Sequence, residues 1–163
     1  HRWSAEKGAH AFGSPDAVDR RKPTGKGRLV RRAVLVNIIV DSLGLCKVPT
    51  LSLLGTFDLE NEAALAAAVS GLSLCADDLF RIGDRVANME RLFNLKRLIN
   101  LKLGITRADD TLPRRLLTEP RPSGGAEGVL PDLDAMLSEY YRARDWTPEG
   151  VPSPQRQQNL GLA

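Results

Sequence analysis

Apolar residues recur along this chain at three- and four-residue steps and rarely alternate with polar ones, and this pattern predicts helices. In residues 29–40 apolar side chains fall on all sides, and Asn37 is the only polar residue after Arg32. We therefore expect this element to be buried. Its β-branched residues would suit a strand, but its length and the lack of a partner strand pattern favour a helix.

Two further helices are predicted downstream. Residues 58–71 have Asp58 as the expected N-cap, a body rich in alanine and Gly71 as the terminator, and the alanines indicate close helix packing. Residues 77–95 form the next helix, whose predicted apolar face consists of Leu79, Ile82, Val86, Met89 and Phe93. Its opposite, polar face consists of Arg81, Asp84, Arg85 and Arg91.

The last third of the chain adds one more helix and a long loop. The hexapeptide "RLFNLK" at 91–96 is followed at once by "RLINLK" at 97–102, a duplication expected to lengthen a helix end or loop. Residues 106–125 are predicted to be an extended loop punctuated by prolines, and residues 132–146 a final amphipathic helix. The predicted class is all-α: an irregular helical domain with long loops.

Composition limits the protein class. The 163 residues are 42% hydrophobic and 26% charged, which is ordinary for one globular domain. The basic segment at 19–32 has no aromatic residue for base stacking, so we expect a solvated loop and no nucleic-acid partner. No run approaches the roughly 20 apolar residues of a membrane span. Two cysteines make no disulfide framework, which favours a reducing, cytoplasmic location. Residues 1–28 are expected to be an irregular connecting segment, and residues 29–163 the helical domain.

Candidate chemistry is concentrated in "DSLGLC", residues 41–46. An acid and a thiol follow an apolar helix there, with a glycine between them that permits close approach of the backbone to another group. One interpretation is a loop wrapped around a ligand. The other is a helix C-terminus with a buried structural cysteine.

Four segments, taken in order, resemble the C-terminal part of the tungsten-dependent aldehyde:ferredoxin oxidoreductase family. They are "DSLGLCK", "IGDRVANMERLFN" at 82–94, "TRADDTLPRRLLTEP" at 106–120, and "DLDAMLSEYYRARDW" at 132–146 with "GVPS" at 150–153. The resemblance covers the chain from about Val30 to its end.

The resemblance implies a fold, an activity and a set of site residues. Cys46 would be the fourth cysteine ligand of a [4Fe-4S] cluster, and Asp41, Gly44, Leu45 and Lys47 would contact a bis-molybdopterin cofactor carrying tungsten or molybdenum. The family oxidises aldehydes to carboxylates and passes the electrons through the cluster to ferredoxin. The remainder of the parent polypeptide and a second copy in a homodimer are the other partners implied.

The chain also departs from the family pattern. The other three cluster cysteines are expected upstream in a CxxCxxxC group, which this sequence lacks, so we expect a C-terminal fragment that is inactive alone. The family's active-site histidine would correspond best to His1. The family's usual Arg-Gly-Trp is Arg-Asp-Trp here, at residues 144–146. The alternative function is a stand-alone helical interaction domain without catalytic activity.

Three other features are interpreted as structural. Cys75 occupies the N-cap position before "ADD" and is expected to serve the helix. The Asp109-Asp110 pair is expected to form an ion-pair network with Arg107, Arg114 and Arg115 that holds the loop. The Tyr140-Tyr141 pair is expected to pack against its surroundings.

Overall fold

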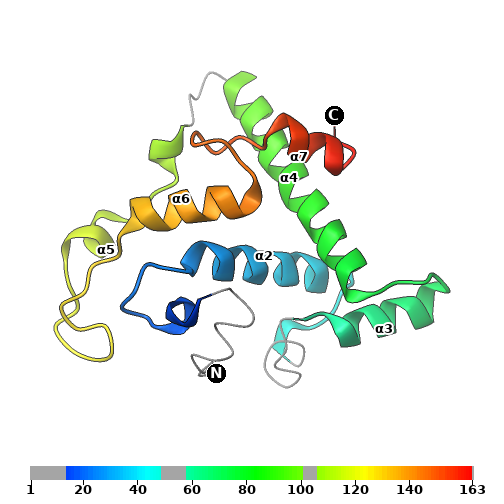
Figure 1. Cartoon of the computed structure of the whole chain (residues 1–163), viewed down its shortest axis with the longest axis horizontal. Coiled ribbons are helices and arrows are strands. Elements are labelled where there is room, and N and C mark those ends of the chain that lie inside the picture. The colour runs from blue at the N-terminus through cyan, green and yellow to red at the C-terminus, as the bar shows by residue number, and fades with distance from the viewer. Residues whose placement is uncertain (1–13, 49–57, 101–105, 163) are drawn as a thin grey trace. The chain divides into compact units, whose positions relative to one another are not determined.

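The computed structural model describes residues 14–48, 58–100 and 106–162, and for residues 96–100 only the course of the backbone. The described residues form helices and loops without a strand, so the predicted all-α class is confirmed (Figure 1). The elements are η1 Pro15–Val18, α2 Lys26–Ser42, α3 Glu60–Ser70, α4 Ala76–Asn100, η3 Arg107–Asp109, α5 Arg114–Thr118, α6 Leu133–Arg144 and α7 Pro154–Asn159. None of the described helices is long and apolar enough to cross a membrane.

The chain divides into two compact units. Unit 1 contains Arg32–Asn94 and Pro154–Ala163, and unit 2 contains Arg2–Arg31 and Leu95–Ser153. Helix α2 therefore contributes its first residues to unit 2 and the rest to unit 1.

Unit 1 has an apolar core made by three helices. Helix α2 contributes the residues predicted to be buried, and none of the core side chains is more than 3% exposed. Burying a Val or Leu side chain contributes about 1.5–3 kcal/mol to folding, so this cluster carries much of the stability of the unit. Its members are Val36, Ile39, Val40, Leu59, Ala63 and Leu79, with Leu45, Ala76 and Phe80 packed against it.

The predicted apolar face of α4 is correct at Leu79, which is 2% exposed, and wrong further along the helix. Met89 and Phe93 are 50% and 58% exposed, whereas Asp84 and Asn88, of which Asp84 was assigned to the polar face, are buried. The reason is that Gly83 brings α4 to within van der Waals distance of α2: a Cβ there would lie 3.3 Å from the Leu35 carbonyl oxygen. Close approach of the backbones has selected the small-residue face of the helix.

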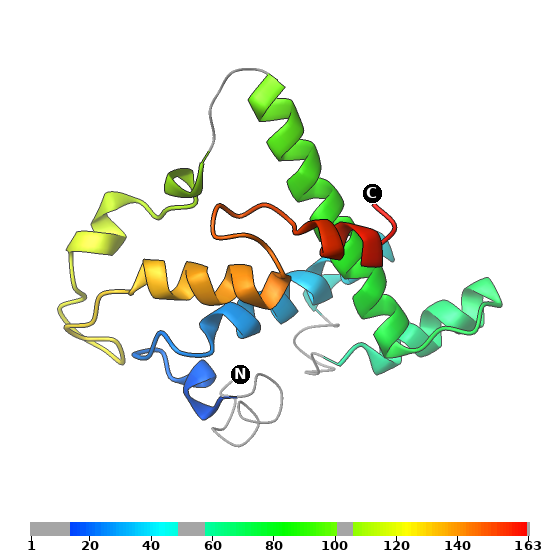
Figure 2. The same ribbon diagram turned by 45° about the horizontal axis from the view of Figure 1, so that its top comes forward.

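Polar partners stabilise Asp84 and Asn88 on the buried face of α4. The Asn88 side-chain amide donates to the Asp84 carbonyl oxygen at 2.7 Å, and the Arg156 guanidinium of α7 donates to the Asp84 carboxylate. Figure 2 shows α7 lying across α4, where this ion pair joins the two helices. Helix α7 was not predicted, because its sequence "PQRQQN" contains no apolar residue.

Helix α3 begins one residue later than predicted. The N-cap is Leu59, in a left-handed conformation with φ 65°, and Asp58 stands before it, its carboxylate accepting from the Glu60 N–H at 3.2 Å. The predicted terminator is confirmed, because Gly71 has φ 72° and its N–H donates to the Ala67 carbonyl. The hexapeptide repeat does lengthen a helix, since α4 continues through Asn100.

Unit 2 begins with a short turn fastened to the start of α2. The Lys26 ammonium donates to the carbonyl oxygens of Ala17 and Asp19, both at 2.6 Å. Burial lowers the pKa of Lys26, and the neighbouring acids Asp19, Asp16 and Glu139 oppose that shift. Ordered structure therefore begins upstream of residue 29, and the basic segment is helical from Lys26 onward, so the prediction of a solvated loop there is wrong.

Helices α2 and α6 approach very closely in unit 2. A Cβ on Gly27 would lie 2.3 Å from the Tyr140 amide nitrogen, so only glycine fits at this contact. Helix α6 starts as predicted, with the Asp132 carboxylate accepting from the Ala135 N–H at 3.1 Å. The preceding region is less extended than predicted, because the sequence between Pro113 and Pro120 folds into the one-turn helix α5.

Candidate functional site

The candidate loop at 41–47 is built on the C-terminus of α2, and its main chain forms a Schellman motif. The Leu45 N–H donates to the Val40 carbonyl at 2.9 Å, and the Gly44 N–H donates to the Asp41 carbonyl at 3.1 Å. Gly44 has φ 68°, the left-handed conformation that this motif requires and that glycine adopts without strain. The glycine is thus explained by backbone conformation. Apart from Gly44 and its two neighbours in the chain, no described protein atom lies within 4 Å of its Cβ position.

Leucine 45 anchors this loop. Its side chain packs on the core cluster that contains Val40, which is the hydrophobic contact typical of a Schellman motif. The flanking residues Gly44 and Cys46 are exposed. The motif therefore fixes the main chain next to the exposed residue Cys46.

Asp41 and Lys47, both predicted as cofactor-binding residues, are brought together. The Lys47 ammonium and the Asp41 carboxylate are 2.9 Å apart, on side chains that are 46% and 61% exposed. The negative end of the α2 dipole disfavours an acid in the last turn, and α2 has no basic residue there. Lys47 supplies the positive charge that offsets both the acid and the helix end.

The two cysteines have different surroundings, although both are reduced and exposed. Cys46 follows the Schellman motif, so the expectation of a buried cysteine there is wrong. Cys75 precedes α4, and its N–H and its thiol both donate to the Asp78 carboxylate, at 2.9 and 3.1 Å. These two hydrogen bonds lower the pKa of Asp78 below its usual 3.8, the main-chain bond having the larger effect. Cys75 thus serves the helix start, as predicted.

The remaining site prediction, His1, lies outside the described residues. Within the described residues, no three His, Cys, Asp or Glu side chains lie close enough together to hold a metal ion. Cys46 therefore offers a single thiolate, whereas a [4Fe-4S] cluster is held by four ligands. A single cysteine in this loop can contribute no more than one of those four ligands.

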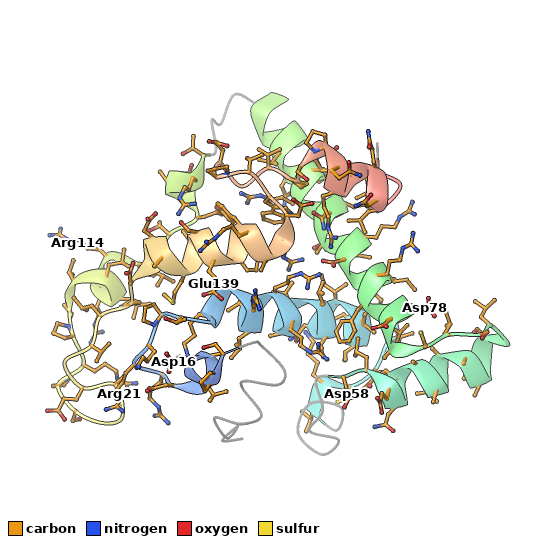
Figure 3. All side chains as sticks on the ribbon, in the orientation of Figure 1. Asp16, Arg21, Asp58, Asp78, Arg114 and Glu139 are labelled. Carbon is orange, nitrogen blue, oxygen red and sulfur yellow. The ribbon has the colours of Figure 1, made fainter. Side chains whose placement is uncertain are left out.

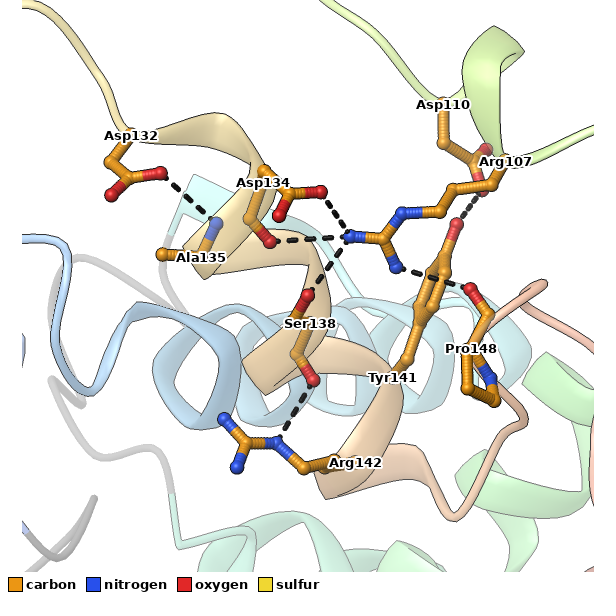
Figure 4. Close-up of polar contacts among 9 residues, drawn as sticks. All are labelled: Arg107, Asp110, Asp132, Asp134, Ala135, Ser138, Tyr141, Arg142 and Pro148. Atoms are coloured by element: carbon orange, nitrogen blue, oxygen red, sulfur yellow. Dashed lines mark hydrogen bonds and ion pairs between the residues drawn. The ribbon is translucent and has the colours of Figure 1, made fainter.

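Two of the quoted segments, 106–120 and 132–146, meet in unit 2 together with Pro148 (Figure 4). The Arg107 guanidinium donates to the Asp134 carboxylate at 2.7 Å, to the Ser138 hydroxyl at 2.9 Å and to the Pro148 carbonyl at 3.1 Å. It also lies 5.1 Å from the ring centre of Tyr141, whose hydroxyl donates to Asp110. Arg107 thus fastens the "TRADD" segment to α6.

The predicted ion-pair partners in this segment are wrong. Asp109 closes a capping box on η3 by accepting from the Thr106 N–H at 2.6 Å, and Arg115 pairs with Glu119 at 3.2 Å. The correct partner of Arg107 was recognisable in principle. Positions 134, 138 and 141 are spaced by four and three residues, so they form one stripe on a helix.

The end of α6 packs its aromatic residues as predicted. Tyr140 and Tyr141 each lie 5.8 Å from Trp146, measured between ring centres. Arg144 is 1% exposed, its guanidinium lies over the rings of Tyr140 and Trp146, and its Nε donates to the Tyr140 hydroxyl at 2.9 Å. Cation–π contacts and this hydrogen bond compensate the buried charge.

Asp145 stands where the family usually has glycine, and it keeps the left-handed backbone conformation that a glycine adopts easily. Asp145 has φ 56° and ψ 48°, and its N–H donates to the Arg142 carbonyl while the Trp146 N–H donates to the Tyr141 carbonyl. This is a second Schellman motif. The "GVPS" segment returns to it, since the Ser153 N–H donates to the Asp145 carbonyl at 3.0 Å.

One unusual group was missed by the sequence reasoning. Glu62, in the first turn of α3, is 2% exposed, and neither of its carboxylate oxygens has a hydrogen-bond partner among the described residues. Its neighbour Ala63 belongs to the unit 1 core. An acid in a first turn is normally exposed and favoured by the helix dipole, so the sequence carried no signal of this burial.

Comparison with known proteins places the chain in a family. The family described as "Aldehyde ferredoxin oxidoreductase, domains 2 & 3" matches residues 1–162. The tungsten-containing aldehyde ferredoxin oxidoreductase of Pyrococcus furiosus is 40% identical over 126 residues, covering 77% of this chain and 19% of the relative. Its namesake in Thermococcus kodakarensis is 36% identical over 129 residues, covering 78% and 20%. This chain belongs to the aldehyde ferredoxin oxidoreductase family, and it spans about a fifth of the length of these relatives.

Proposed function

We propose that this chain is the part of an aldehyde ferredoxin oxidoreductase that supplies one ligand, Cys46, to a [4Fe-4S] cluster and one carboxylate, Asp41, to a tungsten or molybdenum bis-molybdopterin cofactor. Family membership supports the enzyme class. The single observation that carries the residue assignment is that Cys46 is exposed and follows a main chain held by the Schellman motif.

The electrostatics of the loop favour a metal-bound thiolate. Cys46 follows the C-terminal end of α2, where the helix dipole disfavours an uncompensated anion. A thiolate bound to iron has most of its charge neutralised, so the dipole opposes it less. Lys47 adds a positive charge adjacent to the thiol and is already paired with Asp41 at 2.9 Å.

The residues have distinct roles in this proposal. Cys46 holds iron, Asp41 accepts hydrogen bonds from N–H groups of the pterin, and Gly44 and Leu45 set the separation between them. When bound, the tungsten centre would supply the redox chemistry that converts an aldehyde and water to a carboxylate with release of two electrons and three protons, and the cluster would supply the route for those electrons to ferredoxin. The remainder of the parent polypeptide would supply the other three cluster ligands. A cytoplasmic location and a homodimer belong to the same proposal.

The test compares Cys46→Ala with Cys75→Ala in the full-length protein that carries this chain. We expect Cys46→Ala to lose iron and to slow aldehyde oxidation with a ferredoxin-type acceptor by orders of magnitude, because one iron loses its ligand. Cys75→Ala should keep its iron and lose at most about 1 kcal/mol of stability, the scale of a helix cap. Full iron content and full rate in Cys46→Ala would show that the ligand assignment is wrong.

A second variant separates the two cofactors. Asp41→Ala should lower the pterin and tungsten content and leave the iron content close to that of the unmodified protein. Asp58→Ala is a suitable control, since Asp58 is also an acid beside a helix end, and among the described residues its carboxylate accepts from the Glu60 N–H. Parallel loss of iron and tungsten in Asp41→Ala would contradict the division of roles.

A further inference from the structure

Unit 2 contains a cavity of about 370 Å³ that includes none of the residues of the 41–47 loop. It lies where the turn before α2 meets the last turns of α6. Figure 3 shows Glu139, one of its lining residues, between α6 and the start of α2. The lining residues are Ser14, Thr24, Gly25, Arg28, Glu139, Arg142 and Ala143.

Glu139 is the one acid in the lining, and its carboxylate already accepts main-chain hydrogen bonds. The Glu139 carboxylate accepts from the Gly25 N–H at 2.8 Å and from the Arg28 N–H at 3.5 Å, so it caps the start of α2. Its negative charge faces main-chain donors and the positive end of the helix dipole. Glu139 is therefore compensated without using either guanidinium of the cavity.

The two arginines retain donors for a ligand. Arg142 uses its Nε to donate to the Ser138 carbonyl at 3.2 Å, which leaves its two terminal nitrogens. Among the described residues none accepts from the Arg28 guanidinium. The Ser14 hydroxyl oxygen accepts from the Asp16 N–H at 3.2 Å, so its proton is available for donation. Arg28 and Arg142 come from different helices, and together with two hydroxyl groups they surround one space.

The position of the turn before α2 depends on Gly25. Gly25 has φ 81°, and a Cβ there would lie 2.7 Å from the Ala17 Cβ. Lys26, the next residue, is held by its bonds to the Ala17 and Asp19 carbonyls, so its charge is committed to the turn. The rim of the cavity is thus fixed by packing and hydrogen bonds.

We propose that this cavity binds the phosphate group of a small organic phosphate monoester. A guanidinium donates in a planar fork that matches phosphate and carboxylate oxygens. One carboxylate has only two oxygens and is satisfied by a single fork, whereas a phosphate monoester offers three terminal oxygens to two forks and two hydroxyls. The volume exceeds that of a bare phosphate and lies in the range of small-molecule sites, about 300–1,000 Å³. This proposal rests on different residues from those of the proposed function.

The test uses the whole 163-residue chain with glycerol 3-phosphate, inorganic phosphate and succinate as probes. Binding is followed by calorimetry and by the ¹H–¹⁵N signals of Gly25, Arg28 and Ala143, at constant ionic strength set with sodium chloride. We expect saturable binding of glycerol 3-phosphate that is tighter than that of inorganic phosphate, and no saturable binding of succinate.

Variants locate the site. Arg28→Gln and Arg142→Gln should each weaken glycerol 3-phosphate binding at least five-fold, and Arg28→Lys should weaken it less, because it keeps the charge and loses the fork. Arg114→Gln, on the exposed α5 helix, is the matched control and should bind normally. Unchanged affinity in Arg28→Gln and Arg142→Gln, equal binding of succinate, or a response that sodium chloride reproduces would overturn the proposal. Far-UV circular dichroism checks that each variant is folded. If a glutamine variant does not fold, Arg28→Lys still tests the proposal.

Discussion

The Arg156 guanidinium on α7 donates to the Asp84 carboxylate on α4, across 72 positions of sequence. The Asp84 side chain is 7% exposed and that of Arg156 is 21% exposed, so this is a largely buried ion pair. It joins the end of the chain to the middle of the longest helix in unit 1. It also explains how an aspartate is tolerated on the buried face of α4.

Removing one partner of this pair should be strongly destabilising. Arg156→Met is expected to lower the free energy of unfolding by about 3 kcal/mol, because it removes a charged partner from the largely buried Asp84 carboxylate. Urea unfolding measures the change. The double variant Asp84→Asn with Arg156→Met should recover part of the loss, and Arg115→Met, which removes the exposed pair with Glu119, should change stability by about 0.5 kcal/mol or less. Equal effects of Arg156→Met and Arg115→Met would refute the importance of burial.

Replacing the buried acid of α3 should stabilise the protein. Glu62→Met removes a carboxylate that has no hydrogen-bond partner among the described residues and keeps a side chain of similar length. We expect the free energy of unfolding to rise by about 1–3 kcal/mol, the penalty of burying an unsatisfied polar group. Glu60→Met, at an exposed position in the same turn, is the control and should lower stability slightly or leave it unchanged. A loss of stability in Glu62→Met would indicate that the acid is satisfied by a group outside the described residues.

Glycine should be preferred over aspartate at the end of α6. Asp145 adopts φ 56°, a conformation that costs L-residues roughly 1–2 kcal/mol and aspartate somewhat less. Asp145→Gly is therefore expected to raise the melting temperature, and Asp145→Val to lower it strongly. Thermal unfolding followed by circular dichroism gives both values. A melting temperature that is higher for Val than for Gly would be inconsistent with a left-handed residue at this position.

The cap at the start of α4 should depend on pH. Hydrogen bonds from Cys75 lower the folded-state pKa of Asp78 below 3.8, so the folded state binds a proton at this carboxylate less readily than the unfolded state does. The stabilisation by Asp78 is then fully present above about pH 4 and disappears as the pH falls through the lowered folded-state pKa. Accordingly, Asp78→Asn should reduce stability at pH 6, and the difference from the unmodified chain should shrink toward pH 3. A difference that grows with acidification would reverse the assigned direction.

The sequence predicted the helices better than their faces. Helices α2, α3, α4 and α6 follow from apolar spacing and caps, whose signals are local. The face of α4 was mispredicted because Gly83, which adds no hydrophobicity, decides the orientation by allowing α2 to approach. Helices α5 and α7 were missed because short polar helices carry no periodic signal, and α7 depends on the distant partner Asp84.

The candidate site was found from residue types, while its geometry required the structure. The order Asp, Gly, Leu, Cys indicated a ligand loop, and the left-handed conformation of Gly44 is what an Asp-x-x-Gly sequence after a helix would lead one to expect. The Asp41–Lys47 pair and the partners of Arg107 depend on how the chain turns. Charge alone could not select among the several acids near each base.

The position of Leu45, directly before Cys46, has a mechanical consequence. The Leu45 N–H is bonded to Val40 and its side chain packs on the core of unit 1. Displacing the Cys46 backbone outward would require withdrawing Leu45 from the core. The packing of the core therefore restrains the position of the Cys46 sulfur atom. A redox centre held there would keep nearly the same geometry in both oxidation states, and little nuclear rearrangement would accompany each electron that it gains or loses.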